Sequence, residues 1–200
     1  MSRRRLPRAF FARPTLTVAG ELVGKVLVHR LPDGPVAGRI VEVEAYIGED
    51  DPACHAAPGP TRRNAPLYGP PGFAYVYLNY GLHFLMNVVT EVRGFPAAVL
   101  LRALEPLDGL PQMQRRRAAG GAPPHRLTAE AICQGPGNLT VAMGITQAQN
   151  QADLSTGDLY LEDRGLAPPA VAWSPRIGIR VGTDRPWRAI DAASRSVTRG

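Results

Sequence analysis

The clearest alternation of apolar and polar side chains lies in residues 39–46, Arg-Ile-Val-Glu-Val-Glu-Ala-Tyr. It predicts a β-strand with two unlike faces. One face carries Val41, Val43 and Ala45, and the other carries Ile40, Glu42, Glu44 and Tyr46. Two carboxylates among β-branched residues cost desolvation free energy unless each has a partner or a use. The polar face is therefore either solvated or part of a functional site.

Two further patterns predict β-hairpins. A Leu-Pro-Asp-Gly turn separates two apolar runs, so residues 25–30 and 36–46 are expected to pair antiparallel. In residues 73–89 an Asn-Tyr-Gly triplet separates two alternating apolar runs and predicts a tight hairpin tip. Tyr80 would stand at that tip, where packing does not readily explain an aromatic side chain.

The other elements are expected to be short, because 21 Gly and 20 Pro interrupt the chain. This composition favours a strand-rich α+β fold over a helical bundle. The expected elements are a helix running into a strand at 18–28, a strand at 96–104, a helix at 127–133, a helix from Gly135–Asn138 to about Gly144, and strands at 159–161, 170–172 and 175–181.

Three segments of the expected single domain, residues 1–200, lack a regular pattern. Residues 1–12 are expected to form a basic arm, and residues 112–124, with three successive arginines, a flexible insertion. Residues 47–72 contain Pro-Gly clusters and predict a long loop, which in a compact domain is usually functional. Adjacent arginines in this loop, Arg62 and Arg63, suit either phosphate binding or a solvated turn.

Charge and composition narrow the classes of function. A net charge of +6 favours a polyanionic partner, nucleic acid first, although many small basic proteins have none. No apolar run approaches the about 20 residues of a membrane helix, and no signal-type apolar core follows the basic N-terminus. Cys54 and Cys133 are too few for a disulfide framework, so we expect a reducing, cytoplasmic compartment.

Glu44 leads the candidates for catalysis. Tyr46 shares its strand face, and a turn leads from that strand to His55, so a carboxylate, an aromatic ring and an imidazole lie close in sequence. Arg102 is a single charge in an apolar strand pattern, and a buried arginine needs an anion such as Glu44 or a phosphate. Asn87, also in an apolar strand, must be hydrogen-bonded or line a pocket.

An ordered set of short motifs runs from about Phe10 to the C-terminus. They are Glu42-Val-Glu44-Ala-Tyr46, Cys54-His55-Ala56, Arg63-Asn64, Tyr75-Val-Tyr77, Tyr80-Gly81, Met86-Asn87, Leu100-Leu-Arg102-Ala-Leu-Glu-Pro106, Gly135-Pro136-Gly137 and Arg176-Ile-Gly-Ile179. Each string is weak alone, but the ordered set resembles the alkyladenine (3-methyladenine, methylpurine) DNA glycosylases. A Glu-Ala-Tyr on a strand and a Tyr-Gly hairpin tip make the resemblance specific.

The resemblance implies an enzyme of base excision repair that flips a damaged purine out of duplex DNA and hydrolyses its N-glycosidic bond. It implies a single α+β domain with a curved, mostly antiparallel sheet, acting as a monomer with no cofactor and no metal. Glu44 would be the general base that activates a water, and Arg102 would hold the carboxylate and the water. The substrates left open are 3-methyladenine, 7-methylguanine, hypoxanthine and etheno-adenine.

The resemblance also implies how the DNA is held. The base pocket would consist of Tyr46, His55, Tyr77, Asn87 and Leu100, with Tyr80 as the wedge and with Arg62, Arg63, Tyr75, Gly135, Gly137 and Asn138 at the DNA backbone. Asn87 would exclude guanine through its exocyclic amino group. Asn138 stands where the family pattern has a basic residue, which leaves one phosphate contact open.

Two remaining observations bear on mechanism. Glycosylases that also cut the backbone need an amine for a Schiff base, but the only lysine, Lys25, lies in an apolar strand pattern, which favours a monofunctional enzyme. Cys54 beside His55, without a second pair, is a poor metal site.

Two other functions stay open. Glu42 and Glu44 would lie about 7 Å apart along a strand, as in an inverting carbohydrate hydrolase. A non-catalytic DNA-binding module would explain the charge but leave Glu44 without a use.

Overall fold

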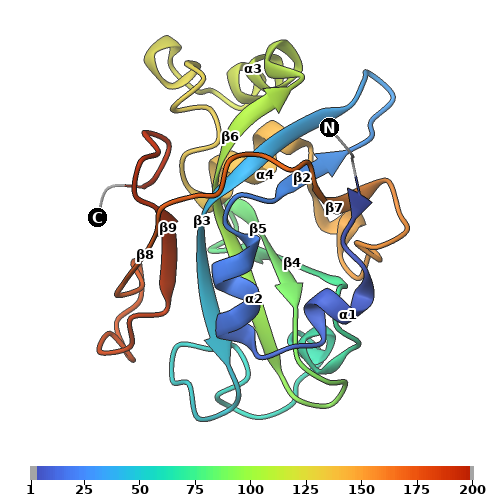
Figure 1. Cartoon of the computed structure of the whole chain (residues 1–200), viewed down its shortest axis with the longest axis vertical. Coiled ribbons are helices and arrows are strands. Elements are labelled where there is room, and N and C mark those ends of the chain that lie inside the picture. Colours follow the sequence, from blue (N-terminus) through green and yellow to red (C-terminus); the bar gives the residue numbers. More distant parts are fainter. Residues whose placement is uncertain (1–3, 199–200) are drawn as a thin grey trace.

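Two long antiparallel strands, β3 (Val36–Ile47) and β6 (Ala97–Asp108), run side by side through the middle of the molecule (Figure 1). The computed structural model describes residues 4–198. The other strands are β1 (Arg4–Arg5), β2 (Val26–His29), β4 (Ala74–Asn79), β5 (His83–Val89), β7 (Leu159–Asp163), β8 (Val171–Ser174) and β9 (Arg188–Asp191). They form one sheet in the order β1-β7-β2-β3-β6-β5-β4, with β9 pairing with β3 and β8 with β9.

Short helices pack against this curled antiparallel sheet. They are α1 (Arg8–Phe11), α2 (Thr15–Leu22), α3 (Leu110–Ala119) and α4 (Pro136–Met143), with 3-10 turns η1 (Ala65–Tyr68), η2 (Pro124–Arg126) and η3 (Gln147–Gln149). Helix α2 packs on β3, and α4 on β5 and β6. The predicted α+β class with a curved, mostly antiparallel sheet is confirmed. None of the helices formed by residues 4–198 is long and apolar enough to cross a membrane.

The two faces of the sheet have different environments. Val43 and Ala45 of β3 lie in the main hydrophobic core together with residues of α2 and α4, such as Leu22 and Leu139. The opposite face is covered by the loop at residues 47–72, whose buried apolar residues pack on the strands in a second cluster of Cys54, Ala56, Leu67, Tyr75, Val89 and Ala98. Because side chains alternate along a strand, the residues between the core positions all point to this second face.

The predicted alternation in β3 holds only from Glu42 onward. The pairing of β3 with β6 shifts register between Ile40 and Glu42, which marks a β-bulge at Val41. A bulge inserts one residue and reverses the facing of the residues before it. Ile40 therefore lies in the main core with Val43 rather than on the Glu42 face, which corrects the sequence prediction.

Both predicted hairpins are confirmed. Strand β2 pairs antiparallel with β3, and β4 pairs with β5 across the Tyr80 tip. Helix α4 begins after Gly135 and ends at Gly144 as expected. Residues 127–133 form turns instead of a helix, and the strand expected at 175–181 is replaced by β9, which begins at Arg188.

The segment predicted as a basic arm is part of the domain. Its first three residues lie outside the described ones, but Arg4 and Arg5 pair with β7. Leu6 and Phe11 are buried, and the Phe11 ring lies 2.7 Å from the position that a Cβ on Gly72 would take. Two apolar side chains among the arginines thus anchor residues 4–12 to the rest of the domain.

The expected flexible insertion also contains a regular element. Residues 112–119 belong to α3, and Met113 on this helix is fully buried against α4. The arginine run is helical because it follows a Gly109 turn and a proline at the first helical turn, both favourable at a helix start. Only the Gly-Gly-Ala-Pro stretch that follows has the irregular form that the sequence predicted.

Replacing Phe11 with alanine tests the packing of the N-terminal segment. We expect Phe11→Ala to lower the free energy of unfolding by about 3–5 kcal/mol, because the ring is fully buried. Urea unfolding measures it, with Phe95→Ala as control, since Phe95 is 43% exposed and should lose about 1 kcal/mol. A loss for Phe11→Ala no larger than for the control would contradict this packing.

Candidate active site and DNA-binding face

One row of side chains crosses four strands on the face under the 47–72 loop. Glu44 of β3 pairs with Leu100 of β6, Leu100 with Asn87 of β5, and Asn87 with Tyr75 of β4. Directly paired residues in adjacent strands present neighbouring side chains on one face. The register thus brings together residues that are up to 56 positions apart in the sequence.

Glu44 is fully buried and held by three donors. The Tyr46 hydroxyl donates to Glu44 Oε2 at 2.8 Å, and Arg102 Nη1 donates to the same oxygen at 3.1 Å. The backbone N–H of Ile177 donates to Oε1 at 2.8 Å. This arrangement brings together the predicted acid, its aromatic neighbour and the predicted arginine.

Glu42 is the second buried carboxylate at this site. Arg102 Nε and Arg188 Nε donate to its Oε1 at 2.9 and 2.8 Å, and the N–H and hydroxyl of Thr198 donate to Oε2, both at 2.6 Å. Burial alone would raise the pKa of Glu42, but the hydrogen bonds from Thr198 and the charge of Arg102 outweigh it and lower the pKa. Glu42 is therefore ionised at neutral pH.

The geometry of the two glutamates argues against an inverting hydrolase. A carboxylate offers about four lone-pair sites, and four donors already occupy those of Glu42. A general acid must carry a proton and a general base must have a free lone pair. Glu42 has neither, so it cannot be the second carboxylate of a Glu42/Glu44 pair.

A small pocket lies beside Glu44 on the same face. Its lining includes Tyr46, His55, Tyr75, Tyr77 and Asn87, and its volume is only about 30 Å³. The His55 and Tyr77 rings lie edge to face with centroids 4.5 Å apart and occupy the space between the strands and the loop. The structure thus brings together the predicted base-pocket residues except Leu100, which lies next to them in the cross-strand row.

Hydrogen bonds fix the polar groups of this pocket. His55 Nδ1 and the Tyr75 hydroxyl lie 2.9 Å apart, and Asn87 Nδ2 donates to the Tyr75 carbonyl at 3.1 Å. Burial, and then the charge of Arg63, lowers the pKa of His55, so the imidazole is neutral at pH 7. Burial raises the pKa of Tyr75 to about 12 and also raises that of Tyr77. The pocket therefore presents neutral rings.

A buried ion pair attaches the 47–72 loop to the C-terminal part of the chain. Arg176 donates to both oxygens of Asp51 at 2.6 and 2.8 Å, and both side chains are fully buried. The Arg176 guanidinium also lies 4.7 Å from the centroid of the Tyr46 ring, and the next residue, Ile177, donates to Glu44. This pair positions the loop that carries His55.

The Tyr80 side chain projects from the hairpin tip. It is 90% exposed, and its φ of 49° lies in the left-handed region that costs a non-glycine residue about 1–2 kcal/mol. Gly81, with φ of 72°, completes the turn. An exposed aromatic ring held in a strained backbone has no packing function, and such strain often marks a functional residue.

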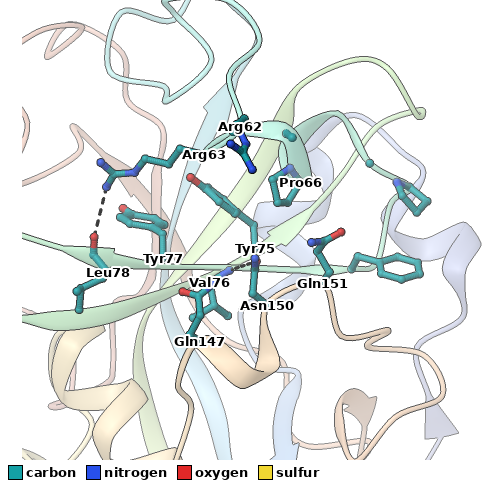
Figure 2. A pocket seen from close by; sticks show the side chains of 14 residues that line it. Arg62, Arg63, Pro66, Tyr75, Val76, Tyr77, Leu78, Gln147, Asn150 and Gln151 are labelled. Atoms are coloured by element: carbon teal, nitrogen blue, oxygen red, sulfur yellow. Dashed lines mark hydrogen bonds between the residues drawn. The ribbon is translucent and has the colours of Figure 1, made fainter. Parts of the chain in front are cut away.

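Arg62 and Arg63 extend from the loop over the tyrosines of β4 (Figure 2). Arg63 Nη2 donates to the Leu78 carbonyl at 3.3 Å, and its guanidinium lies 5.7 Å from the Tyr77 centroid. They line a hollow of about 530 Å³ with Gln147, Asn150 and Gln151 on the opposite side. We expected Tyr75 at the DNA backbone, but the structure buries its ring between this hollow and the base pocket.

The first turn of α4 lies against the β4–β5 hairpin that carries Tyr80. A Cβ on Gly137 would come within 2.9 Å of the His83 side chain, so only glycine allows this approach. Asn138 Nδ2 donates to the Gln134 carbonyl at 2.6 Å, and no acidic residue lies in the first turn. The start of α4 thus lies beside the hairpin. Its residues Gly135, Gly137 and Asn138 do not line the base pocket.

Comparison with known proteins identifies the family. A model of the methylpurine-DNA glycosylase (MPG) family matches residues 9–195. The chain belongs to this family. It is accordingly a DNA glycosylase, a DNA-repair hydrolase that acts on N-glycosyl bonds of alkylated bases, and DNA is its substrate. The alternatives of a carbohydrate hydrolase and of a non-catalytic DNA-binding module are therefore set aside.

Relatives of this glycosylase match nearly its whole length. A protein of Methanocella arvoryzae is 50% identical over 198 residues, which cover 97% of this chain and 96% of the relative. One of Burkholderia cenocepacia is 50% identical over 186 residues, covering 92% and 86%, and one of Chlorobaculum tepidum is 44% identical over 193 residues, covering 96% and 89%. Each carries the name "Putative 3-methyladenine DNA glycosylase".

Sequence reasoning missed several groups that hold the glycosylase's two glutamates. The Ile177 N–H, Arg188 and Thr198 all donate to Glu44 or Glu42 from the C-terminal part of the chain. A backbone N–H leaves no trace in residue type, and Arg188 and Thr198 lie outside every motif found. Within residues 4–198, no group of three His, Cys, Asp or Glu side chains could hold a metal ion.

Replacing Glu42 with glutamine tests the buried network. We expect Glu42→Gln to lower the free energy of unfolding by about 3–5 kcal/mol at pH 7, because Arg102 and Arg188 lose their shared anion. The folded-state pKa of Glu42 lies below its usual value of 4.5, so this stabilisation is present above pH 4.5 and is lost as the pH falls through the folded pKa. The difference between wild type and variant should shrink in acid.

Urea titrations at several pH values measure both effects. Glu21→Gln is the matched control, because its ion pair with Arg13 is exposed and should contribute at most about 1 kcal/mol. Equal losses for Glu42→Gln and Glu21→Gln at pH 7 would contradict a structural role for Glu42.

Proposed function

We propose that the chain is a monofunctional glycosylase that flips alkylated or deaminated purines out of duplex DNA and hydrolyses the N-glycosidic bond with a water activated by Glu44. The observation that carries the proposal is the fully buried Glu44 carboxylate, held by Arg102 and Tyr46 beside a pocket of aromatic rings. The product is an abasic site. The enzyme acts as a monomer in the cytoplasm, where its substrate is chromosomal DNA.

Lone-pair counting supports Glu44 as the general base. Three donors occupy three of about four lone-pair sites of its carboxylate, which leaves one to accept a hydrogen bond from a water. The three donors also fix the direction of the free lone pair. A water held there is oriented by Glu44 and can lose its proton to it as the sugar C1′ is attacked.

The position of Lys25 supports the monofunctional reaction. Its Nζ donates to Asp163 at 2.5 Å on the β7 side of β2, in an ion pair. A Schiff base needs an amine that can reach the sugar carbon, and this one is held by a carboxylate and does not line the base pocket. A hydrolytic mechanism without a covalent intermediate therefore remains the better proposal.

The damaged base would enter between Tyr77 and the loop residue His55. Ligand pockets are usually about 300–1,000 Å³, and the present 30 Å³ holds little more than a water. The rings of His55 and Tyr77 must therefore move apart before a purine can stack between them. Because the His55 and Tyr77 rings are neutral, they can move apart without separating charges. Stacking on them would stabilise the flipped base by about 1–3 kcal/mol.

Asn87 is proposed to exclude guanine. It lies in the cross-strand row between Leu100 and Tyr75 and lines the pocket, and one of its amide hydrogens is already donated to the Tyr75 carbonyl. That bond fixes the direction of the amide, so a purine amino group facing it meets a rigid obstacle. Tyr80 would fill the space that the flipped nucleotide leaves in the duplex.

Replacing Glu44 with glutamine tests the proposed mechanism. We expect Glu44→Gln to lower the single-turnover rate of base release by about 10²–10⁴-fold, because glutamine cannot take a proton from water. Lesion binding should persist, since the aromatic pocket is unchanged. A gel assay on duplexes with hypoxanthine or etheno-adenine, cleaved with alkali at abasic sites, measures the rate.

The exposed Glu49 gives the matched control in the same part of the chain. Glu49→Gln should release bases at the wild-type rate. Wild-type release by Glu44→Gln would remove Glu44 from the mechanism.

Replacing Tyr80 with alanine tests the wedge. We expect the Kd for lesion duplex to rise about 5- to 100-fold, because a wedge acts only when a nucleotide is out of the stack. The Kd for undamaged duplex should change less, and Tyr80→Phe, which keeps the ring, should bind as the wild type does. Equal losses of Tyr80→Ala on both duplexes would rule out a wedge.

A further inference from the structure

A hollow of about 790 Å³ lies apart from the base pocket. It is enclosed by the end of α3, the turn that follows it, the first turn of α4 and the C-terminal segment, and its polar lining residues are Arg117, Arg126, Glu130, Gln134, Asn138, Arg195 and Thr198. It shares no lining residue with the base pocket or with the hollow in Figure 2. It therefore needs an explanation of its own.

Arg117 in this hollow is buried without a counter-charge. The residue is only 8% exposed, and its Nε has no hydrogen-bond partner. Within residues 4–198 it forms no ion pair, and burial lowers its pKa, with Arg126 lowering it further. Cys133 lies nearby, but burial raises the pKa of its thiol to about 12, so it carries no charge at pH 7.

The other buried arginines have the carboxylate partner that Arg117 lacks. Each is paired with at least one carboxylate: Arg102 with Glu42 and Glu44, Arg164 with Glu162 and Asp108, Arg176 with Asp51, and Arg188 with Glu42. A buried guanidinium without an anion is unfavourable by several kcal/mol. Arg117 is the exception among the described buried arginines, and it borders a hollow large enough to hold a ligand.

The surroundings of Arg117 are positive. Arg126 and Arg195 also line the hollow, and neither has an ion pair among the described residues, while Glu130 is the one carboxylate in the lining. Arg126 Nη1 donates to Gln134 at 3.3 Å, so most of its donors remain free. Asn138 belongs to the first turn of α4, whose unpaired N–H groups add partial positive charge.

The hollow is connected to the active site and to the wedge hairpin. Thr198 in its wall donates to Glu42, which shares Arg102 with Glu44. On the other side, the first turn of α4 contacts His83, which pairs with Asn79 next to the Tyr80 tip. The first turn of α4 thus borders both the hollow and the Tyr80 hairpin.

We propose that this hollow binds a phosphate group, supplied by the DNA backbone near the flipped nucleotide, with Arg117 as its buried contact. The choice of DNA as the source rests on the proposed function. Guanidinium groups bind phosphate in a bidentate manner, and three of them suit a group with several anionic oxygens better than a single carboxylate. The contact would also supply the phosphate binding for which Asn138, in place of a basic residue, is poorly suited.

The test compares Arg117→Met with Arg115→Met on undamaged duplex DNA. Arg115 lies on the same helix, is 65% exposed in its side chain and does not line the hollow. Losing one phosphate contact should reduce the slope of log K against log salt by about 1 and weaken binding about 5- to 10-fold at about 0.1 M salt. Arg115→Met should change neither quantity. Unchanged slope and affinity in Arg117→Met would exclude the DNA backbone as the source.

Stability separates a binding role from a structural one. Arg117 loses no partner on substitution, so the urea midpoint of Arg117→Met should equal or exceed that of the wild type. A clearly lower midpoint would overturn the proposal, because it would show that the guanidinium already has a stabilising partner. Arg126→Gln and Arg195→Gln, both at exposed positions, should each weaken DNA binding with unchanged midpoints, and they keep the test valid if Arg117→Met folds poorly.

A second arm distinguishes free phosphate from DNA. Inorganic phosphate should raise the melting temperature of the wild type above that in chloride of equal ionic strength, and this increase should vanish in Arg117→Met. If phosphate still raises the melting temperature of Arg117→Met, the assignment of the site to Arg117 is overturned. If the substitution removes this increase but leaves the DNA affinity unchanged, the site binds free phosphate instead of the DNA backbone. None of these measurements depends on base release. A failure of the proposed Glu44 mechanism would appear only in the base-release assay, so it can be distinguished from a failure of the phosphate site.

Discussion

The arrangement of the candidate active site of this glycosylase depends on one guanidinium group, that of Arg102. Arg102 donates from Nε to Glu42 and from Nη1 to Glu44, at 2.9 and 3.1 Å, and all three side chains are buried. Two carboxylates buried this close together repel each other unless a cation lies between them. Arg102 supplies that cation and, by donating to both, fixes the position of Glu44 beside the aromatic pocket.

The two carboxylates that share Arg102 have different surroundings. Glu42 is saturated by four donors and serves as an anchor for Arg102, Arg188 and the Thr198 backbone. Glu44 keeps one free lone pair. The difference comes from the donors that reach each carboxylate, since Arg188 of β9 and Thr198 donate to Glu42, whereas Tyr46, which lines the pocket, donates to Glu44. The site thus depends on the last residues of the described chain as well as on β3.

The site also combines a part fixed by the sheet with a part carried by a loop. Glu44, Leu100, Asn87 and Tyr75 are fixed by the register of four strands, whereas His55 lies on a loop held by the Asp51–Arg176 pair. In the proposed mechanism, movement of the His55 ring would open the pocket without disturbing Glu44. The geometry around Glu44 would then stay constant while the base enters.

The sequence by itself determined the parts of the structure that follow from local rules. Alternation placed Glu42, Glu44 and Tyr46 on one strand face, and the Asn-Tyr-Gly triplet placed Tyr80 at a hairpin tip, because side-chain facing and turn type depend on neighbouring residues alone. The ordered motifs gave the family. The same local rules failed where a bulge reversed Ile40, where two buried apolar residues anchored the N-terminal segment, and where the arginine run became α3.

Only the tertiary structure decided which of these residues meet. Arg102 lies 60 residues from Glu42, and Thr198 lies 156 residues from it, so neither pairing could be predicted from spacing. Strand order and register set these contacts, and they arise from the burial of the whole sheet rather than from any short segment. The closed pocket and the unpaired Arg117 have the same origin, because a cavity or a missing partner is a property of packed elements and not of a sequence.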